Sequence, residues 1–227
     1  MENVKFKNGM LETTKEFLLS VLAGMSISFG CVAFLASGNK IVGALFFVVG
    51  LFMILNFNFS LFTGKVCYAL DNKPNFILKL VLIWFGNIVG AIFMALMVGA
   101  TRLTPIHDAV MGVVEAKLSD NVLSLFFLGV FCNMLIFLAV YGYKNFENIL
   151  AKMVALFFGV SVFVLCGFEH CIADAFYFAF AGSYTLKTFA YLLMITLGNV
   201  VGGLFFPLMM KAVKVIEEKK NNKNNKK

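Results

Sequence analysis

The sequence predicts an all-α integral membrane protein with six transmembrane helices, arranged as a 3+3 inverted repeat. Of its 227 residues, 61% are hydrophobic and only 14% are charged, whereas soluble domains carry about 25% charged residues. A helix needs roughly 20 apolar residues to cross a bilayer. Six tracts satisfy this requirement and occupy almost the whole chain, at about 17–37, 43–70, 78–100, 122–143, 150–181 and 189–211.

The ends of the chain are polar, so we divide the sequence into an N-terminal segment (1–16), a transmembrane domain (17–211) and a basic tail (212–227). No cleavable signal peptide is expected, because charged residues run up to a full-length span. Lys and Arg number fourteen on the side of the two termini and four on the other side, if Lys65 inside the second span is left out. This bias predicts a plasma-membrane protein with both termini cytoplasmic. The tail is expected to be disordered, and not a nucleic-acid site.

The cysteines give no sign of a metal or cofactor site. All of them lie within or against apolar tracts, and none shows the close, repeated spacing of a zinc or iron–sulfur site. We therefore expect reduced packing residues, no metal and no cofactor. They are Cys31, Cys67, Cys132, Cys166 and Cys171.

An internal repeat relates the two halves of the chain. Residues 84–91 (WFGNIVGA) match residues 196–203 (TLGNVVGG) in the pattern Gly-Asn-x-Val-Gly. Three spans in each half is an odd number, so the second half must enter the membrane from the opposite face, which makes the repeat inverted. The paired glycines favour close helix packing, and Asn87 and Asn199 are expected to link helices or face the pore.

In each half, the span before this motif is interrupted, at 56–65 (NFNFSLFTGK) and at 167–174 (GFEHCIAD). Irregular backbone inside a membrane must be buried or must line a watery cavity. Interruptions at matching positions of inverted halves point to a substrate site near the midplane. The second interruption also carries Glu169, His170 and Asp174, and ionisable groups at this depth are functional candidates.

Five separated motifs now identify a family resemblance: Leu61-Phe-Thr-Gly64, Lys117 followed by Cys132-Asn-Met134, Gly167-Phe-Glu-His170, Ile172-Ala173 and Gly198-Asn199. In order and topology they resemble the formate/nitrite transporter family of small-anion channels, over essentially all six spans. The resemblance implies an aquaporin-like protomer and a homopentamer with one pore per protomer. It also implies small monovalent anions as cargo.

The resemblance further implies roles for individual residues. His170 would face the permeating anion, with the Thr63 hydroxyl opposite. Glu169 is expected to bind backbone N–H groups of the interruption, because a free carboxylate in an anion pore would repel its cargo. The remaining central pore residues would be Asn199, Lys117 and Asn133. Lys117 has an equally weighted alternative, a lysine whose ammonium reaches the membrane interface.

Two apolar constrictions also follow from the resemblance. The extracellular ring would consist of Phe47, Leu51 and Phe163, and the cytoplasmic ring of Leu61, Phe62 and Val154. Two residues depart from the family pattern, since Asp174 replaces an Asn and Lys65 follows Leu-Phe-Thr-Gly. They could pair with each other, or they could change which ions approach.

The leading hypothesis is a channel or proton-coupled transporter for small monovalent weak-acid anions in a lipid bilayer, with formate and nitrite as first candidates. Hydrosulfide and short carboxylates stay open. A neutral-solute pore is the second hypothesis, although paired Asn-Pro-Ala motifs are missing from the sequence. The third is an intramembrane enzyme that uses Glu169 and His170 as an acid/base pair. It lacks a second histidine in the spans, since His107 falls in a loop, and we do not expect an enzyme.

Overall fold

The structure is a computed structural model that describes residues 2–103 and 105–224, with side chains described from residue 9 onwards. Within these ranges the chain is entirely helical apart from its turns and connections, and it contains no strand. Five helices are long and apolar enough to cross a membrane, namely Gly9–Ala36, Phe76–Gly99, Val122–Asn145, Ile149–Cys166 and Leu186–Asn224. The prediction of an all-α, multi-pass membrane protein is therefore confirmed.

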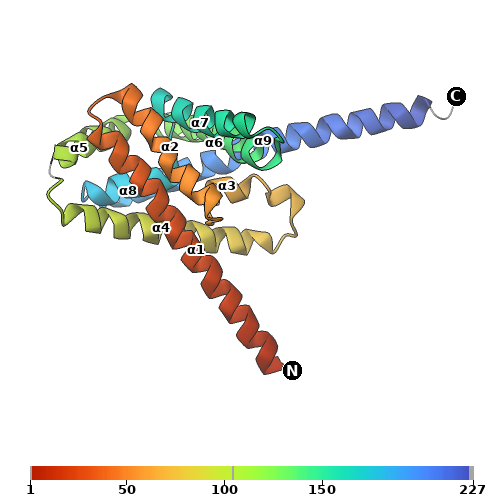
Figure 1. Cartoon of the computed structure of the whole chain (residues 1–227), viewed down its shortest axis with the longest axis horizontal. Helices are drawn as coiled ribbons and strands as arrows, with labels where there is room; N and C mark the ends of the chain where they lie inside the picture. Colours follow the sequence, from red (N-terminus) through yellow and green to blue (C-terminus); the bar gives the residue numbers. More distant parts are fainter. Residues whose placement is uncertain (1, 104, 225–227) are drawn as a thin grey trace.

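The helices form two sets with the same succession of long and short elements (Figure 1). The first set is α1 (Glu2–Ala36), α2 (Lys40–Asn56), α3 (Phe62–Val66) and α4 (Phe76–Gly99), with a 3-10 turn (Ala69–Asp71) after α3. The second set is α6 (Val122–Asn145), α7 (Ile149–Cys166), α8 (Cys171–Phe180) and α9 (Leu186–Asn224). Helix α5 (Pro105–Ser119) joins the two sets.

Each short helix crosses over to the other set. Helix α1 packs on α2 and α4, and α6 packs on α7 and α9, while α3 lies against α9 and α8 lies against α4. The close packing uses the repeated glycines as predicted, because a Cβ atom at Gly90 would overlap the Val21 carbonyl and one at Gly202 would overlap the Val130 carbonyl. The crossing brings the N-terminal ends of α3 and α8 into the interior of the bundle.

Near both ends of the described chain, the transmembrane helices continue into the polar segments. The N-terminal segment runs without a break into α1, and α9 continues to Asn224, so the prediction of a disordered tail is wrong over residues 212–224. Residues 225–227 of that prediction lie outside the described ranges. Extending a formed helix avoids the cost of nucleation, and Lys214 and Glu218 stand four residues apart, a spacing that supports a helix.

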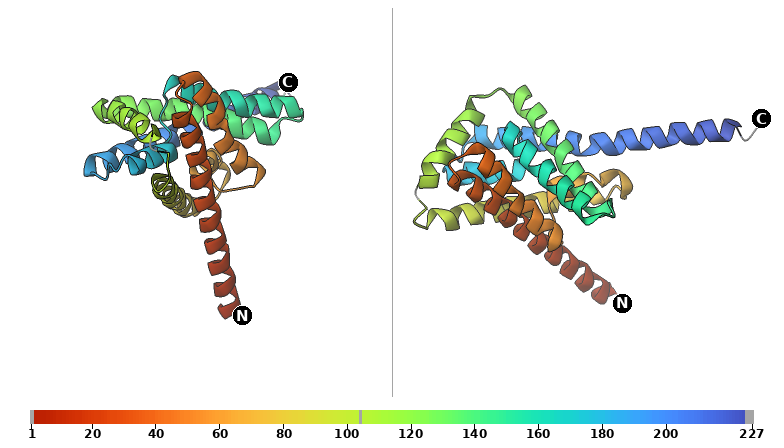
Figure 2. Two further views of the ribbon diagram at one scale, coloured as in Figure 1. Left: turned by 60° about the vertical axis from the view of Figure 1, so that its left-hand side comes forward. Right: turned by 45° about the horizontal axis from the view of Figure 1, so that its top comes forward.

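Helix α5 replaces the external loop that the sequence predicts after the third span. It lies at the end of the bundle opposite to both chain termini, as Figures 1 and 2 show. Ile106, Val110 and Val114 are buried at four-residue intervals, so α5 is an amphipathic helix held by one apolar face. Its last turn carries Lys117.

Candidate pore site where two helix breaks meet

The first break separates α2 from α3, with residues 57–61 outside any helix. One buried side chain, Asn87 of α4, binds backbone groups on both sides of Leu61 in this break. The Asn87 Oδ1 atom accepts a hydrogen bond from the Phe62 N–H (2.8 Å), and its Nδ2 atom donates to the carbonyls of Ser60 (2.8 Å) and Ser20 (2.7 Å). These contacts supply the partners that lipid cannot offer to a broken helix.

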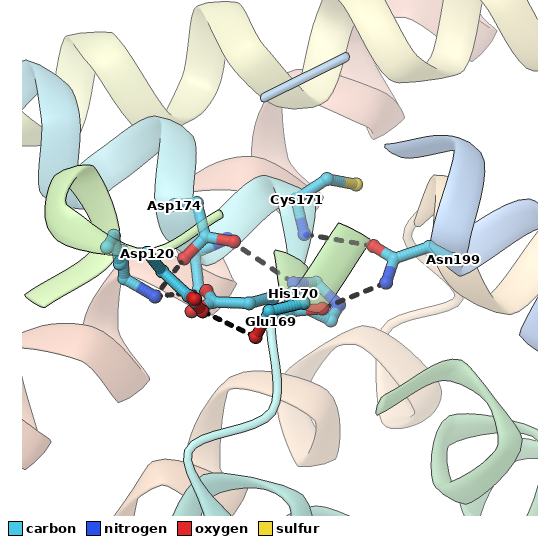
Figure 3. Close-up of polar contacts among 9 residues, drawn as sticks. Asp120, Glu169, His170, Cys171, Asp174 and Asn199 are labelled. Carbon is cyan, nitrogen blue, oxygen red and sulfur yellow. Dashed lines mark hydrogen bonds and ion pairs between the residues drawn. The ribbon is translucent and has the colours of Figure 1, made fainter. Parts of the chain in front are cut away.

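The second break separates α7 from α8 and is satisfied in the same way by Asn199 of α9. Gly167 ends α7 with a φ of 72°, a left-handed conformation that glycine adopts without strain. The Asn199 Oδ1 atom accepts from the Cys171 N–H (2.9 Å), and Nδ2 donates to the carbonyls of Glu169 (2.9 Å) and Gly129 (2.8 Å). Figure 3 shows Asn199 bridging residues 169 and 171.

His170 and Thr63 meet at the point where the two breaks come together. Both are buried, and the His170 Nε2 atom lies 3.0 Å from the Thr63 hydroxyl oxygen. His170 also caps α8, because its Nδ1 atom accepts a hydrogen bond from the Ala173 N–H at 3.3 Å. With Nδ1 acting as an acceptor, a neutral ring carries its proton on Nε2 and donates it to Thr63. The predicted pair is thus brought together across 107 residues of sequence.

An aromatic pair stands directly beside His170. The Phe163 ring stacks on the His170 imidazole, with ring centroids 5.8 Å apart. Phe163 also makes an edge-on aromatic contact with Phe47, with centroids 5.7 Å apart. Leu51 is buried one turn further along α2. The residues predicted for the extracellular ring therefore lie on the two facing helices α2 and α7, next to the histidine.

The residues predicted for the cytoplasmic ring differ in burial. Leu61 and Phe62 are buried at the start of α3, beside Thr63. Val154 is 43% exposed and lines an apolar surface hollow together with Val48 and Phe52. Val154 thus differs from the other two in its exposure, and the grouping of the three residues as a ring stays a prediction.

Glu169 makes an ion pair with Lys117 of α5 instead of binding the backbone of the break. The expected role for its carboxylate is wrong, since the amide of Asn199 already serves that backbone. Lys117 is 11% exposed in its side chain and turns into the protein, so the alternative of an interfacial lysine is also excluded. A buried ammonium is stabilised here by direct contact with carboxylate.

Asp174 pairs with the same lysine. Its Oδ1 atom lies 2.8 Å from the Lys117 ammonium, and its side chain is only 1% exposed. Asp174 therefore does not use Lys65 as its partner. Lys65 lies partly buried at the end of α3.

A cavity of about 370 Å³ lies between the Lys117 ion pairs, His170 and the Phe47–Phe163 contact. It is lined at its polar end by Lys117, Glu169, His170 and Asp174, and at its apolar end by Phe47 and Phe163. Lys40 at the start of α2 and Asp120 just after α5 also line it, so the cavity lies on the α5 side of His170. Asn133 is not among its lining residues, and its Nδ2 atom donates to the Asn199 carbonyl at 2.6 Å. Asn133 thus links α6 to α9.

One link between the halves was missed from the sequence. The indole N–H of Trp84 donates to the Thr196 hydroxyl at 3.1 Å. The two residues hold the same position in the repeat, three residues before Asn87 and Asn199 respectively. The alignment of the two motifs already paired them, and contact between two equivalent positions is what a two-fold axis between the halves would produce.

Comparison with known proteins places this geometry among membrane transporters. A family profile described as "Formate/nitrite transporter" matches residues 2–213. A probable formate transporter of Methanothermobacter thermautotrophicus is 30% identical, over 85% of this chain and 85% of its own length. The nitrite transporter NirC of Salmonella typhimurium is 30% identical, over 82% of this chain and 78% of its own length.

Two solved structures are similar in fold. One is described as a pentameric formate channel with formate bound and has a TM-score of 0.80 at 26% identity, covering 90% of this chain and 98% of that one. The other is described as an FNT family ion channel and has a TM-score of 0.76 at 28% identity, covering 85% and 87% of the two chains.

Proposed function

Because the chain belongs to the formate/nitrite transporter family, we propose that it is a pore for small monovalent anions of weak acids, with formate and nitrite as its first candidate substrates. The family match confirms the resemblance drawn from the five motifs. It also makes the chain a transporter or channel, not an enzyme. Relatives named for formate and for nitrite are about equally similar to it, so identity alone does not rank the two anions.

The observation that carries the proposal is the contact between His170 and Thr63. It places a hydrogen-bonding pair, an N–H and a hydroxyl, directly beside the apolar Phe47–Phe163 contact. A bare anion must lose its water to pass aromatic side chains, which is expensive. A neutral acid avoids most of this cost. Passage past His170 is therefore proposed to be linked to a proton, with the pocket binding the anion as, or nearly as, its neutral acid.

The proposed architecture is a 3+3 inverted repeat with interrupted second and fifth helices, assembled as a homopentamer. The matching hydrogen bonds of Asn87 and Asn199 and the Trp84–Thr196 contact support the repeat. The similar solved channel is a pentamer by its description, which supports the assembly. Thr63 and His170 come from one chain, so each protomer would hold its own pore. Lys and Arg counts support plasma-membrane insertion with cytoplasmic termini.

The test is uptake into liposomes that contain the purified protein, with formate, nitrite, hydrosulfide and glycerol offered separately over a pH series. We expect saturable uptake of formate or nitrite, no uptake of glycerol, and an altered pH profile in His170→Gln. The matched control is Asp108→Asn, because Asp108 lies exposed on α5 away from the cavity.

Each outcome decides between the hypotheses. Uptake of hydrosulfide alone would make hydrosulfide the substrate in place of formate and nitrite. Uptake of glycerol would favour a pore for neutral solutes. A pH profile that is the same in His170→Gln and in the unmodified protein would exclude the proton-linked role of His170. Uptake of none of the four compounds would contradict the proposed function.

A further inference from the structure

The cluster around Lys117 contains one more carboxyl group than it has cations. Glu169 and Asp174 both contact the single ammonium, and the side chains of the three residues are between 1% and 11% exposed. With both acids ionised the cluster would carry a net negative charge inside the membrane. A buried charge without a partner costs several kcal/mol, and in practice such a group takes up or gives up a proton.

A buried oxygen atom of Asp174 also lacks a donor. Oδ1 is bound by Lys117, but Oδ2 has no hydrogen-bond donor among the described residues. The Glu169 carboxyl group binds the same ammonium as the Asp174 carboxyl group, so the two groups lie close together. Two ionised carboxylates can only repel each other at this distance, whereas one shared proton turns the contact into a hydrogen bond.

Among the residues that the structure describes, no second cation contacts the pair. The titratable groups that face the pair are thiols, a phenol and an imidazole, from α1, α6, α8 and the second break, and the thiols and phenol are uncharged at neutral pH. They are Cys31, Cys132, His170, Cys171 and Tyr177. Lys40, which is exposed, and Asp120, which is partly exposed, also line the cavity.

We propose that Glu169 and Asp174 share one exchangeable proton, and that Asp174 thereby selects anions of weak acids over anions of strong acids. The inference rests on the proposed function. In the proton-transfer step the O–H bond of the shared carboxylic acid breaks and an O–H bond forms on the weak-acid anion in the cavity. The neutral acid then moves past Phe163 and His170. The ionised pair regains its proton from water on the α5 side.

An anion of a strong acid cannot take this proton. It enters the cavity still charged and meets the aromatic contact without neutralisation. If the pair has lost its proton, the same anion also meets a net negative cluster, because one ammonium faces two carboxylates. Only the missing proton transfer separates the two classes of anion, because the negative cluster repels both classes alike, and both effects depend on Asp174.

The test compares nitrite with nitrate, two planar anions of similar size of which only nitrite is the anion of a weak acid. Uptake of both is measured in liposomes at equal pH on the two sides, over a pH series. Asp174→Asn is nearly isosteric and removes the exchangeable proton, Asp174→Glu restores a carboxyl group, and Asp108→Asn is the matched control. Infrared spectroscopy of the purified proteins detects a protonated carboxyl group without requiring transport.

We expect the nitrite-to-nitrate uptake ratio to fall about tenfold in Asp174→Asn, because nitrite then reaches the aromatic contact as a charged anion, as nitrate does. Desolvating a charge costs several kcal/mol, and a tenfold change corresponds to about 1.4 kcal/mol. In the unmodified protein the ratio should decrease as rising pH removes the shared proton, and in Asp174→Asn it should stay flat. The infrared band should disappear in Asp174→Asn and return in Asp174→Glu.

The two proposals fail in different ways. Absence of nitrite and formate uptake in the unmodified protein would contradict the proposed function, while the infrared band would still test the shared proton. An unchanged ratio in Asp174→Asn, with normal uptake, would overturn the selectivity role. An infrared band that is missing from the unmodified protein, or that persists in Asp174→Asn, would overturn the shared proton.

Discussion

The two helix breaks have the same backbone arrangement and different chemistry. In each break, an asparagine side chain from the last long helix of the same half accepts a hydrogen bond from the first N–H of the short helix. The same side chain donates a hydrogen bond to the carbonyl group two residues earlier in the chain. The residue between these two backbone groups is Leu61 in the first break and His170 in the second. Four residues later, the first break has Lys65 and the second has Asp174. The repeated motif thus gives both breaks the same backbone hydrogen bonds, and function depends on the positions at which the two breaks differ.

The largest expected effect comes from removing the asparagine side chains that bind the backbone of the two breaks. Replacing Asn87 or Asn199 with Ala leaves two backbone groups of the break, one N–H and one carbonyl, without this partner, each worth about 1–3 kcal/mol. Thermal unfolding in detergent should show a similar, severe loss of stability in both variants. A large loss in only one of them would show that the two breaks are not equivalent in energy.

Next in size is the change Lys117→Met. It removes the only cation that contacts Glu169 and Asp174 in the described structure, and breaking a buried ion pair from one side costs about 3–5 kcal/mol. Because only the second break has this cluster, Lys65→Met at the other break is the comparison. The loss of stability in Lys117→Met should become smaller at acidic pH, where protonation neutralises the carboxylates. A loss that is independent of pH would contradict this explanation.

The change His170→Leu converts the second break into a copy of the first at its central position. The fold should survive, because Asn199 still serves the backbone. Anion uptake should fall about 10- to 100-fold, since a hydrogen bond to a charged group is worth about 1.5–3 kcal/mol. Uptake at the normal rate by a folded His170→Leu protein would remove His170 from the pore.

The smallest expected effect belongs to Lys65→Met. Lys65 is partly buried and forms no ion pair within the described residues, so its loss should change stability by less than about 1 kcal/mol. Melting temperature and uptake are the two measurements. A severe defect would mean that Lys65 has a partner role comparable to that of Asp174.

Local patterns in the sequence predicted most of the fold and part of the site. Hydropathy placed the spans, the Gly-Asn-x-Val-Gly repeat paired the halves, and the two motifs at Thr63 and His170 predicted a contact that the structure contains at 3.0 Å. These features could be found because they depend on composition and spacing along the chain. Helix α5 was missed because its apolar face is short and lies in a tract that hydropathy assigns to a loop.

The sequence by itself determined that the protein crosses a membrane several times and breaks two helices at matching motifs, because burial in lipid leaves a strong apolar signal and a repeated pattern. Only the tertiary structure decided how the polar residues pair. It paired Glu169 and Asp174 with Lys117, and it showed that the side chain of Asn199 binds the backbone of the second break. Such pairings depend on which helices cross, and charge attracts any nearby partner regardless of its distance in sequence. Of the two departures that the sequence left unexplained, Asp174 and Lys65, the structure gives a partner to Asp174.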